Sequence, residues 1–320
     1  HAVIGEGERR LDQRRPEPLR RALLSLLAQE GLDGAQDELI VVDNDGAGSA
    51  EATVLEIAAN APIPVRYVQE KTPGVAAVRN TAFREAKGEF LCLLDDDQEA
   101  DKCFLSELHR ALETFKGDLA FSAIEAVFEG AIPEPQDAWL RLFARTYPDA
   151  EGELRKEHRP GLSTGGVLVR RSAVSAVFGT GAPFDLALGR LGGEDTAFFR
   201  AMHGARKISL WVPGAKIREF IPESRATVRF LLERRFGSGQ VRTRMHLRGS
   251  KLRAPFEVAL FMGLGAGQAS VAALKWGAAK TRRQSHKETE ALAEMAAGLG
   301  KLLWPFEIKR YGAKKSKKGT

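Results

Sequence analysis

Hydrophobic and polar positions along the first two thirds of the chain change period repeatedly, between short apolar runs typical of strands and the spacing of amphipathic helices. The strand-like segments are residues 38–45, 64–69, 89–97 and 118–130, and the helix-like segments are residues 19–29, 51–60, 74–88, 101–115 and 191–204. Strands that alternate with helices in this order are typical of a mostly parallel sheet with helices on both faces. The pattern therefore predicts an α/β fold with a Rossmann-like sheet.

The regular alternation is interrupted between residues 131 and 174. Residues 131–160 are rich in proline and charge, which predicts a loop with a short helix around Trp139. Residues 161–174 have the pattern of a glycine turn, a strand and the start of a helix. We expect these segments to complete one domain that covers residues 1–217.

The C-terminal third has a different pattern. No charged residue occurs from Val258 to Leu274, and a single helical stripe runs through this region. The stripe consists of Phe256, Leu260, Leu264, Gly267, Val271 and Leu274. Because roughly 20 apolar residues are needed to span a bilayer, we expect a helix that lies at a membrane surface or packs on the first domain. The predicted division is residues 1–217, a basic segment 218–253, and a helical extension 254–320 with a disordered basic end.

Charge is unevenly distributed along the chain. The net charge is +6, yet residues 218–253 and 280–320 are each strongly basic, and the first 217 residues are net acidic. Basic regions attract the phosphates of nucleotides, nucleic acids or lipid headgroups, but few aromatic residues lie among these charges to stack on bases. Cys92 and Cys103 form no disulfide framework or zinc motif, which favours a reducing cytoplasm. The polar start of the chain lacks the apolar core of a signal peptide.

Three adjacent acids, Asp95, Asp96 and Asp97, follow a buried-strand pattern. Ligands of open α/β sheets bind beyond the carboxyl ends of the strands. Neighbouring carboxylates there repel one another unless a cation is present, and Mg²⁺ or Mn²⁺ is held by one or two carboxylates together with substrate phosphates. Such an ion would neutralise charge on a departing diphosphate. A solvated acidic loop is the alternative interpretation of these three residues.

Two glycines and two acids, Gly192-Gly193-Glu194-Asp195, open the helical pattern at residues 191–204. Carboxylates in the first turn of a helix are favoured by its dipole, so a helix cap explains them without catalysis. A general base, however, must also be a carboxylate within hydrogen-bond reach of an acceptor hydroxyl. Asp195 and Glu194 are therefore candidate catalytic residues.

A third pattern runs from Gly74 to Asn80 and places Arg79 in the first turns of a helix. Arginine makes bidentate contacts with phosphate or with a base edge. A surface arginine on an amphipathic helix is the commoner role of any single arginine, so this motif gains weight only beside the others.

In order and spacing, these motifs resemble the family 2 glycosyltransferases over about residues 14–239, and especially the bacterial exopolysaccharide transferases that build on lipid-linked sugars. The resemblance implies a GT-A fold, a nucleotide-sugar donor with UDP favoured, Mn²⁺ or Mg²⁺ as cofactor, and inversion by a single displacement. It implies a metal on Asp97 with Asp95, and ribose contact at Asp96. It also implies that Asp195 is the base.

The resemblance assigns further residues to donor binding. They are Asp43, Asn44 and Asp45 after the second strand, Gly74, Arg79 and Asn80 in the next helix, Thr164 and Gly165 beside the donor sugar, and Arg234 and Arg235 over the diphosphate. The chain departs from the family at its start, where Ala2-Val3-Ile4 leads into Gly5-Glu6-Gly7 and the family's base-binding threonine has no counterpart. Only Arg14-Arg15-Pro16 is similar to the family's first turn.

We therefore expect transfer to a lipid-linked or saccharide acceptor, by a protein bound peripherally to the anionic cytoplasmic face of the cell membrane, with no nucleic-acid partner. One alternative is a sugar nucleotidyltransferase, which would have a basic glycine-rich loop where Gly5-Glu6-Gly7 is acidic. The other is a non-catalytic protein that binds membranes or nucleic acids, against which the intact Asp97 and Asp195 argue.

Overall fold

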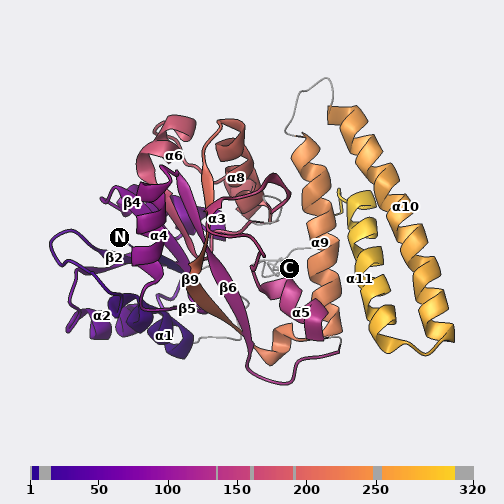
Figure 1. Ribbon diagram of the computed structural model, residues 1–320, viewed down its shortest axis with the longest axis horizontal. Coiled ribbons are helices and arrows are strands. Elements are labelled where there is room, and N and C mark those ends of the chain that lie inside the picture. The colour runs from indigo at the N-terminus through magenta and orange to yellow at the C-terminus, as the bar shows by residue number, and fades with distance from the viewer. Residues whose placement is uncertain are drawn as a thin grey trace, which may run out of the picture.

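The computed structural model describes residues 2–6, 16–134, 136–158, 162–189, 192–247 and 254–306. Figure 1 shows a sheet flanked by helices, with three long helices beside it. The strands are β1 (Ala2–Glu6), β2 (Leu39–Asp43), β3 (Val65–Gln69), β4 (Phe90–Asp95), β5 (Gln98–Ala100), β6 (Leu119–Phe128), β7 (Gly152–Glu153), β8 (Val167–Arg170) and β9 (Ser209–Ile221). The helices are α1 (Pro16–Leu27), α2 (Glu51–Ala58), α3 (Val75–Glu85), α4 (Phe104–Thr114), α5 (Gln136–Phe143), α6 (Arg171–Phe178), α7 (Leu186–Gly189), α8 (Glu194–Gly204), α9 (Val228–Leu247), α10 (Ala254–Thr281) and α11 (Ser285–Leu302), with short 3₁₀ turns η1 (Lys156–His158) and η2 (Glu223–Arg225).

Within the described residues the strands form one nine-stranded sheet, in the order β3-β2-β1-β4-β8-β6-β9-β5 with β7 beside β9. The strands β3, β2, β1 and β4 are parallel, and so are β6 and β9. The remaining pairs are antiparallel and lie in the half of the sheet that contains β8 and β9. The predicted α/β fold with a parallel-rich sheet is confirmed.

Each face of the sheet carries its own apolar layer, because successive side chains of a strand point to opposite faces. In β2, Leu39 and Val41 pack with α1, α2 and α4, whereas Ile40 and Val42 pack with α3, α6 and α8. All four side chains are fully buried, and burying each one contributes about 1.5–3 kcal/mol. This two-sided burial explains why the parallel strands appear in the sequence as continuous apolar runs.

The first strand is present in spite of its unusual sequence. β1 pairs with β2 and β4 at the centre of the parallel half, with Glu6 opposite Asp43 and Gly5 opposite Asp95. The acids that end β2 and β4 are therefore brought to the same edge of the sheet. The predicted turn at residues 14 and 15 lies outside the described residues.

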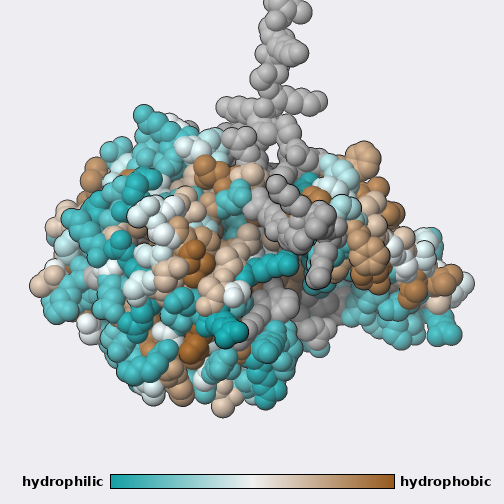
Figure 2. Space-filling model, turned by 90° about the horizontal axis from the view of Figure 1, so that it is seen from above, coloured by the Kyte–Doolittle hydropathy of each residue, from teal (hydrophilic) through white to brown (hydrophobic). Residues whose placement is uncertain are grey.

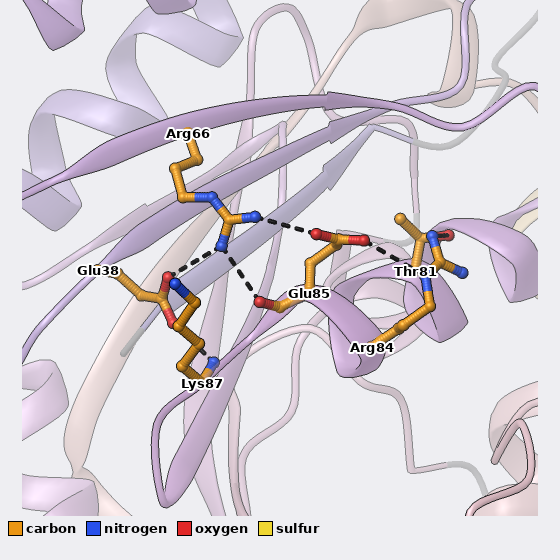
Figure 3. Close-up of polar contacts among 6 residues, drawn as sticks. All are labelled: Glu38, Arg66, Thr81, Arg84, Glu85 and Lys87. Atoms are coloured by element: carbon orange, nitrogen blue, oxygen red, sulfur yellow. Dashed lines mark hydrogen bonds and ion pairs between the residues drawn. The ribbon is translucent and has the colours of Figure 1, made fainter.

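Helix α3 is fixed at both ends, and this determines where Arg79 lies. At its start, Asn44 Oδ1 accepts a hydrogen bond of 2.8 Å from the Gly74 N–H. At its end, Arg66 of β3 donates to the Glu85 carboxylate at 2.9 Å and to the Glu85 carbonyl at 3.2 Å (Figure 3). Arg79 projects from the helix between these two attachments.

The long strand β9 was not predicted from the sequence. Its first residues, Ser209 to Val212, are all buried, whereas farther along Ala215 and Ile217 are buried between exposed neighbours. Because a continuous buried run changes to alternating burial within one strand, neither pattern is long enough to identify β9 from the sequence. β9 crosses the predicted boundary at residue 217, so the start of the basic segment 218–253 belongs to the sheet.

The three long helices α9, α11 and α10 pack on one another through small residues, with α11 contacting both of the others (Figure 1). A Cβ added to Gly239 of α9 or to Gly300 of α11 would collide with the backbone of the other helix. Likewise, a Cβ on Gly265 of α10 would lie 2.7 Å from the Gly298 carbonyl oxygen. The predicted helical extension is thus a closely packed unit, while the predicted basic end beyond residue 306 lies outside the described residues.

Candidate active site

An ion-pair triad joins α3 to α8 at the edge of the sheet where the parallel strands end. Arg79 Nη1 lies 2.8 Å from Glu194 Oε1 and 2.6 Å from Asp195 Oδ1. All three side chains are largely buried, with exposed fractions of 10%, 9% and 17%. Burial lowers the pKa of Arg79, but the charges of Asp195 and Glu194 outweigh this and raise it overall. The arginine stays protonated and holds both acids in place.

Asp195 is the predicted general base, and its carboxylate contacts Thr164 as well as Arg79. The N–H of Thr164 lies 3.4 Å from its Oδ2, and the Thr164 hydroxyl lies 3.4 Å from its Oδ1. Burial raises the pKa of Asp195 to about 6, with Glu194 adding to this effect and Arg79 opposing it. The carboxylate is therefore ionised at neutral pH, yet more basic than an ordinary aspartate, as proton abstraction requires.

Glu194 differs from its neighbour in having an open oxygen. Its Oε1 accepts from Arg79, whereas Oε2 is buried and has no hydrogen-bond partner within the described part of the chain. A buried acceptor of this kind is costly unless a ligand or water satisfies it. Glu194 thus remains a candidate for binding a substrate hydroxyl.

The two residues of the predicted helix pair have different partners, because Arg79 contacts the acids and Asn80 contacts the backbone of Phe184. Asn80 Nδ2 donates to the Phe184 carbonyl at 2.8 Å, and its Oδ1 accepts from the Phe184 N–H at 2.9 Å. Asn80 therefore fixes the segment that leads into α7 and α8. A direct role of Arg79 and Asn80 in donor binding stays a prediction.

The acids that follow β2 contact their own loop. Asp43 is fully buried, and its carboxylate accepts from the N–H groups of Asp45 and Ala50 at 2.7 and 3.2 Å and from the Tyr67 hydroxyl at 2.9 Å. Asn44 Nδ2 donates to the carbonyls of residues 70 and 72 at 2.7 and 2.8 Å. These two residues shape the edge of the site, and Asp45 is the more exposed of the three.

The predicted metal ligands Asp95 and Asp97 lie near Glu219, where β4 ends beside β9. We call these three residues the acidic corner. Asp97 is 5% exposed, and its Oδ2 accepts an ion-paired hydrogen bond of 3.0 Å from Arg225. Burial raises the pKa of Glu219 to about 7, and the charges of Asp97 and Asp95 add to this. Glu219 was not predicted as a site residue, because β9 itself was not predicted. Asp96 is half-buried in the turn that follows β4.

The acidic corner suits a divalent cation in its chemistry. In the described ranges no group of three or more His, Cys, Asp or Glu side chains has the arrangement of a metal site. Mg²⁺ and Mn²⁺ are usually held by only one or two carboxylates, with substrate phosphates completing the shell. Asp97 and Asp95 would supply the hard oxygen ligands that such an ion prefers.

Gln98 and Gly165 connect the acidic corner to the base. Gln98 Oε1 accepts from the Asp95 N–H at 3.1 Å, and its Nε2 lies 3.5 Å from Glu219 Oε2. A Cβ on Gly165 would lie only 2.5 Å from Gln98 Nε2, so a larger residue at this position would have to displace the Gln98 side chain. Since Thr164, next to Gly165, contacts Asp195, one turn of chain joins both parts of the site.

The two predicted arginines of α9 face different surroundings. The Arg234 guanidinium lies 5.0 Å from the Phe143 ring centroid, and its charge lowers the pKa of Glu219 in the acidic corner. Burial, together with the charge of Arg242, lowers the pKa of Arg235. Of the pair, Arg234 is the one beside the acidic corner, and sequence alone did not distinguish them.

The family model of glycosyl transferase family 2 matches residues 13–178. The chain is also 32% identical over 305 residues to the succinoglycan biosynthesis protein ExoM of Rhizobium meliloti (strain 1021), which covers 94% of each chain. This chain belongs to glycosyl transferase family 2. As a member of that family it is a glycosyltransferase, and it is similar to a protein of exopolysaccharide biosynthesis, as the motifs predicted.

Two solved structures share the fold described above. The S. aureus TarS fragment 1–349 in complex with UDP has a TM-score of 0.54 at 15% identity, covering 91% of this chain and 88% of that one. GalNAc-T7 with UDP, GalNAc and Mn²⁺ has a TM-score of 0.50 at 15% identity, covering 69% of this chain and 43% of that one. These similarities confirm the predicted GT-A fold.

Proposed function

We propose that this protein transfers a sugar from a UDP-sugar to a hydroxyl group of a lipid-linked or polysaccharide acceptor, in a metal-dependent reaction that inverts the anomeric configuration. One observation carries the proposal: the turn at Thr164 and Gly165 joins a buried carboxylate suited to act as base, Asp195, to an acidic corner suited to a metal-bound diphosphate. A transferase needs both parts at a fixed separation.

The identities of donor and acceptor rest on similarity. UDP occupies the TarS complex and the GalNAc-T7 complex, whose folds this chain shares. The relative ExoM is a succinoglycan biosynthesis protein, which supports a growing polysaccharide as acceptor. A Mn²⁺ ion, as in the GalNAc-T7 complex, or Mg²⁺ held by Asp97 and Asp95 would supply Lewis-acid neutralisation of the donor's diphosphate.

The residues of the chain divide the work of one displacement. Asp195 accepts the proton of the acceptor hydroxyl while the hydroxyl oxygen forms its bond to the anomeric carbon. The bond from that carbon to the diphosphate oxygen breaks, and the electron pair leaves with the nucleoside diphosphate. Arg79 keeps Asp195 ionised and aligned, and Arg234 adds positive charge beside the leaving group.

We further propose that α10 holds the protein on the cytoplasmic face of an anionic membrane. The predicted stripe is exposed along the length of the helix, with Phe256 and Leu274 exposed by 73% and 77%. Figure 2 shows apolar side chains on the side of the molecule that α10 forms. An exposed apolar surface of this extent is typical of an interaction site.

An in-plane position on the membrane fits α10 better than a transmembrane one. Among the described residues α10 is the helix whose length and composition would allow a span, with a mean hydropathy of 1.4 over an 18-residue stretch. The polar helix α11 is tied to it, however, through Lys301 to Gln268 at 2.7 Å and Glu294 to Lys275 at 2.8 Å. A spanning α10 would draw these charges into hydrocarbon, whereas an interfacial one leaves them in water.

A panel of nucleotide sugars offered to the purified protein with Mn²⁺ and a lipid-linked saccharide tests the proposed activity. We expect one UDP-sugar to be consumed and the product to have the opposite anomeric configuration. Asp195→Asn should abolish transfer and leave nucleotide binding nearly intact, because the base acts only in the transition state. Loss of UDP affinity with unchanged turnover would instead make Asp195 a binding residue and leave Glu194 as the candidate base.

A further inference from the structure

A buried arginine that takes no part in the proposed reaction lies behind the site. Arg145 follows α5 and is 6% exposed. Its Nε donates to the Ser122 carbonyl at 2.8 Å and its Nη1 to the Ser163 carbonyl at 3.1 Å. Its Nη2 donates to the carbonyls of Gly165 and Gly166 at 2.7 and 2.9 Å. One guanidinium thus binds four backbone oxygens, three of which belong to the turn before β8.

The environment of this guanidinium is unusual for a buried cation. Within the described residues no carboxylate oxygen lies at ion-pair distance from Arg145, so backbone dipoles replace a counter-ion. Burial lowers its pKa to about 10, against the opposing effects of Tyr147 and three carboxylates of the site. Those carboxylates are Glu219, Asp95 and Asp195. Arg145 is therefore charged at neutral pH, and its charge acts on both parts of the site.

The turn that Arg145 holds is closely packed against neighbouring side chains. Gly166 has a φ of +68°, and a Cβ there would collide with Ser122 and approach the Arg145 guanidinium. Gly165 packs on Gln98, which itself contacts the acidic corner. Thr164, between these fixed points, is 1% exposed and makes both contacts to the base. The alignment of Asp195 therefore depends on a turn whose carbonyl oxygens accept hydrogen bonds from Arg145.

We propose that Arg145 is a positioning residue of the transfer site, which holds the turn at residues 163–166 against the base and supplies a buried positive charge to the surrounding acids. This inference rests on the proposed function, because its role is defined by the orientation of Asp195. Lysine cannot replace it, since a single ammonium group cannot reach four carbonyl oxygens in fork geometry.

Three substitutions separate the geometric role from the charge. Arg145→Lys keeps the charge and loses the fork, so kcat should fall about a hundredfold, as expected for a misplaced catalytic group, while the acidic limb of the kcat/KM profile stays near pH 6. Arg145→Met loses both, so kcat should fall at least as far and the acidic limb should move to higher pH. Arg145→Ala should regain activity when guanidinium chloride is added at millimolar concentration.

Arg170→Met is the matched control. Like Arg145, which lies 5.4 Å from the Phe121 ring centroid, Arg170 lies over an aromatic ring, with its guanidinium 4.6 Å from the Phe90 centroid. Arg170 is only partly buried, however, and it pairs with the surface acids Glu89 and Glu113. We expect its kcat and pH profile to match those of the unmodified protein.

Thermal melting and UDP binding by calorimetry accompany each assay. A folded Arg145→Met or Arg145→Lys variant with unchanged kcat and acidic limb overturns the inference while leaving the proposed function intact. If Arg145→Met does not fold, Arg145→Lys decides: an unchanged kcat overturns the inference, and a lowered kcat with an unmoved acidic limb supports it. Failure of the unmodified protein to bind UDP or transfer sugar would instead refute the proposed function.

Discussion

Arg79 Nη1 lies 2.6 Å from Asp195 Oδ1, although the two residues are 116 positions apart in the chain. The same nitrogen contacts Glu194 at 2.8 Å, so one buried cation balances two buried anions. Removing this cation would leave two uncompensated buried charges and lower the free energy of unfolding by several kcal/mol. The arrangement also makes the ionisation of the base depend on a residue that would otherwise be assigned to the donor.

Arg79→Met tests this dependence. Without the arginine charge, the pKa of Asp195 should rise above about 6, and the acidic limb of the kcat/KM profile should move to higher pH. Two unpaired buried carboxylates should also lower the free energy of unfolding by roughly 3–5 kcal/mol at pH 7. The measurements are a pH–rate profile and urea unfolding. Arg66→Met is the control for general damage to α3, because Arg66 on β3 contacts Glu85 at the end of that helix. An unmoved acidic limb in a folded Arg79→Met protein would contradict the coupling.

Glu219→Gln tests whether the acidic corner stores electrostatic strain. Its folded-state pKa of about 7 lies above the ordinary glutamate pKa of 4.5, so the native state binds the proton more tightly than the unfolded chain. Its contribution to stability is then fully present below pH 4.5 and is lost as pH rises through 7.

Urea unfolding at pH 5 and pH 8 measures this contribution. The unmodified protein should lose more stability than Glu219→Gln between the two values, and the variant should be the more stable of the two at pH 8. Equal pH dependence in both proteins would show that Glu219 is not strained. Added Mn²⁺ should reduce the difference if the corner binds a cation.

Asp97→Asn addresses the metal. The amide keeps the shape of the side chain and removes an anionic ligand, so transfer should collapse and Mn²⁺ should no longer strengthen UDP binding. Substitution of Arg225, the ion-pair partner of Asp97, provides a contrast. Arg225→Gln leaves the Asp97 carboxylate intact and removes the positive charge 3.0 Å from it. We expect Mn²⁺ affinity, measured by calorimetry without substrate, to rise in Arg225→Gln and fall in Asp97→Asn. Full activity in EDTA would refute metal dependence.

The sequence was sufficient where one local pattern determines one element. The continuous apolar run from Leu39 to Val42, which is fully buried in the structure, made β2 recognisable in the sequence. Parallel topology alone placed the acids that end β2 and β4 at one edge of the sheet. Family resemblance identified the family. In contrast, the burial pattern of β9 changes along its length, so no single period identified it, and Glu219 was lost with the strand.

Contacts between distant segments could not be predicted in the same way. Nothing around Arg145 in the sequence distinguishes it from the surface arginines of a charged loop, because its partners are backbone carbonyls of residues 122 and 163–166. Similarly, the i and i+1 neighbours Arg234 and Arg235 have the same local signature, and only the packing of α9 gives them different surroundings. Side-chain partners of this type are a property of the assembled fold.

The final prediction concerns α10 and the membrane. Its exposed stripe includes Leu260 and Leu264, at 51% and 53% exposure, in the segment without charge. Lysine and arginine follow at residues 275, 280, 282 and 283, and each basic residue near an anionic leaflet contributes about 1 kcal/mol. We therefore expect the protein to sediment with anionic liposomes, to be released by high salt or detergent, and to bind neutral vesicles poorly.

The double variant Leu260→Glu/Leu264→Glu should remain in the supernatant. Two carboxylates on the membrane-facing side of an interfacial helix oppose insertion and are repelled by the anionic surface. Leu55→Glu is the matched control, since Leu55 on α2 is 58% exposed and lies on the catalytic body away from α10. It should sediment like the unmodified protein. If the double variant retains UDP-sugar hydrolysis but loses transfer to a lipid-linked acceptor in vesicles, α10 delivers the site to its acceptor. If both variants sediment equally with anionic vesicles, the stripe is not the membrane contact and the basic regions alone account for binding.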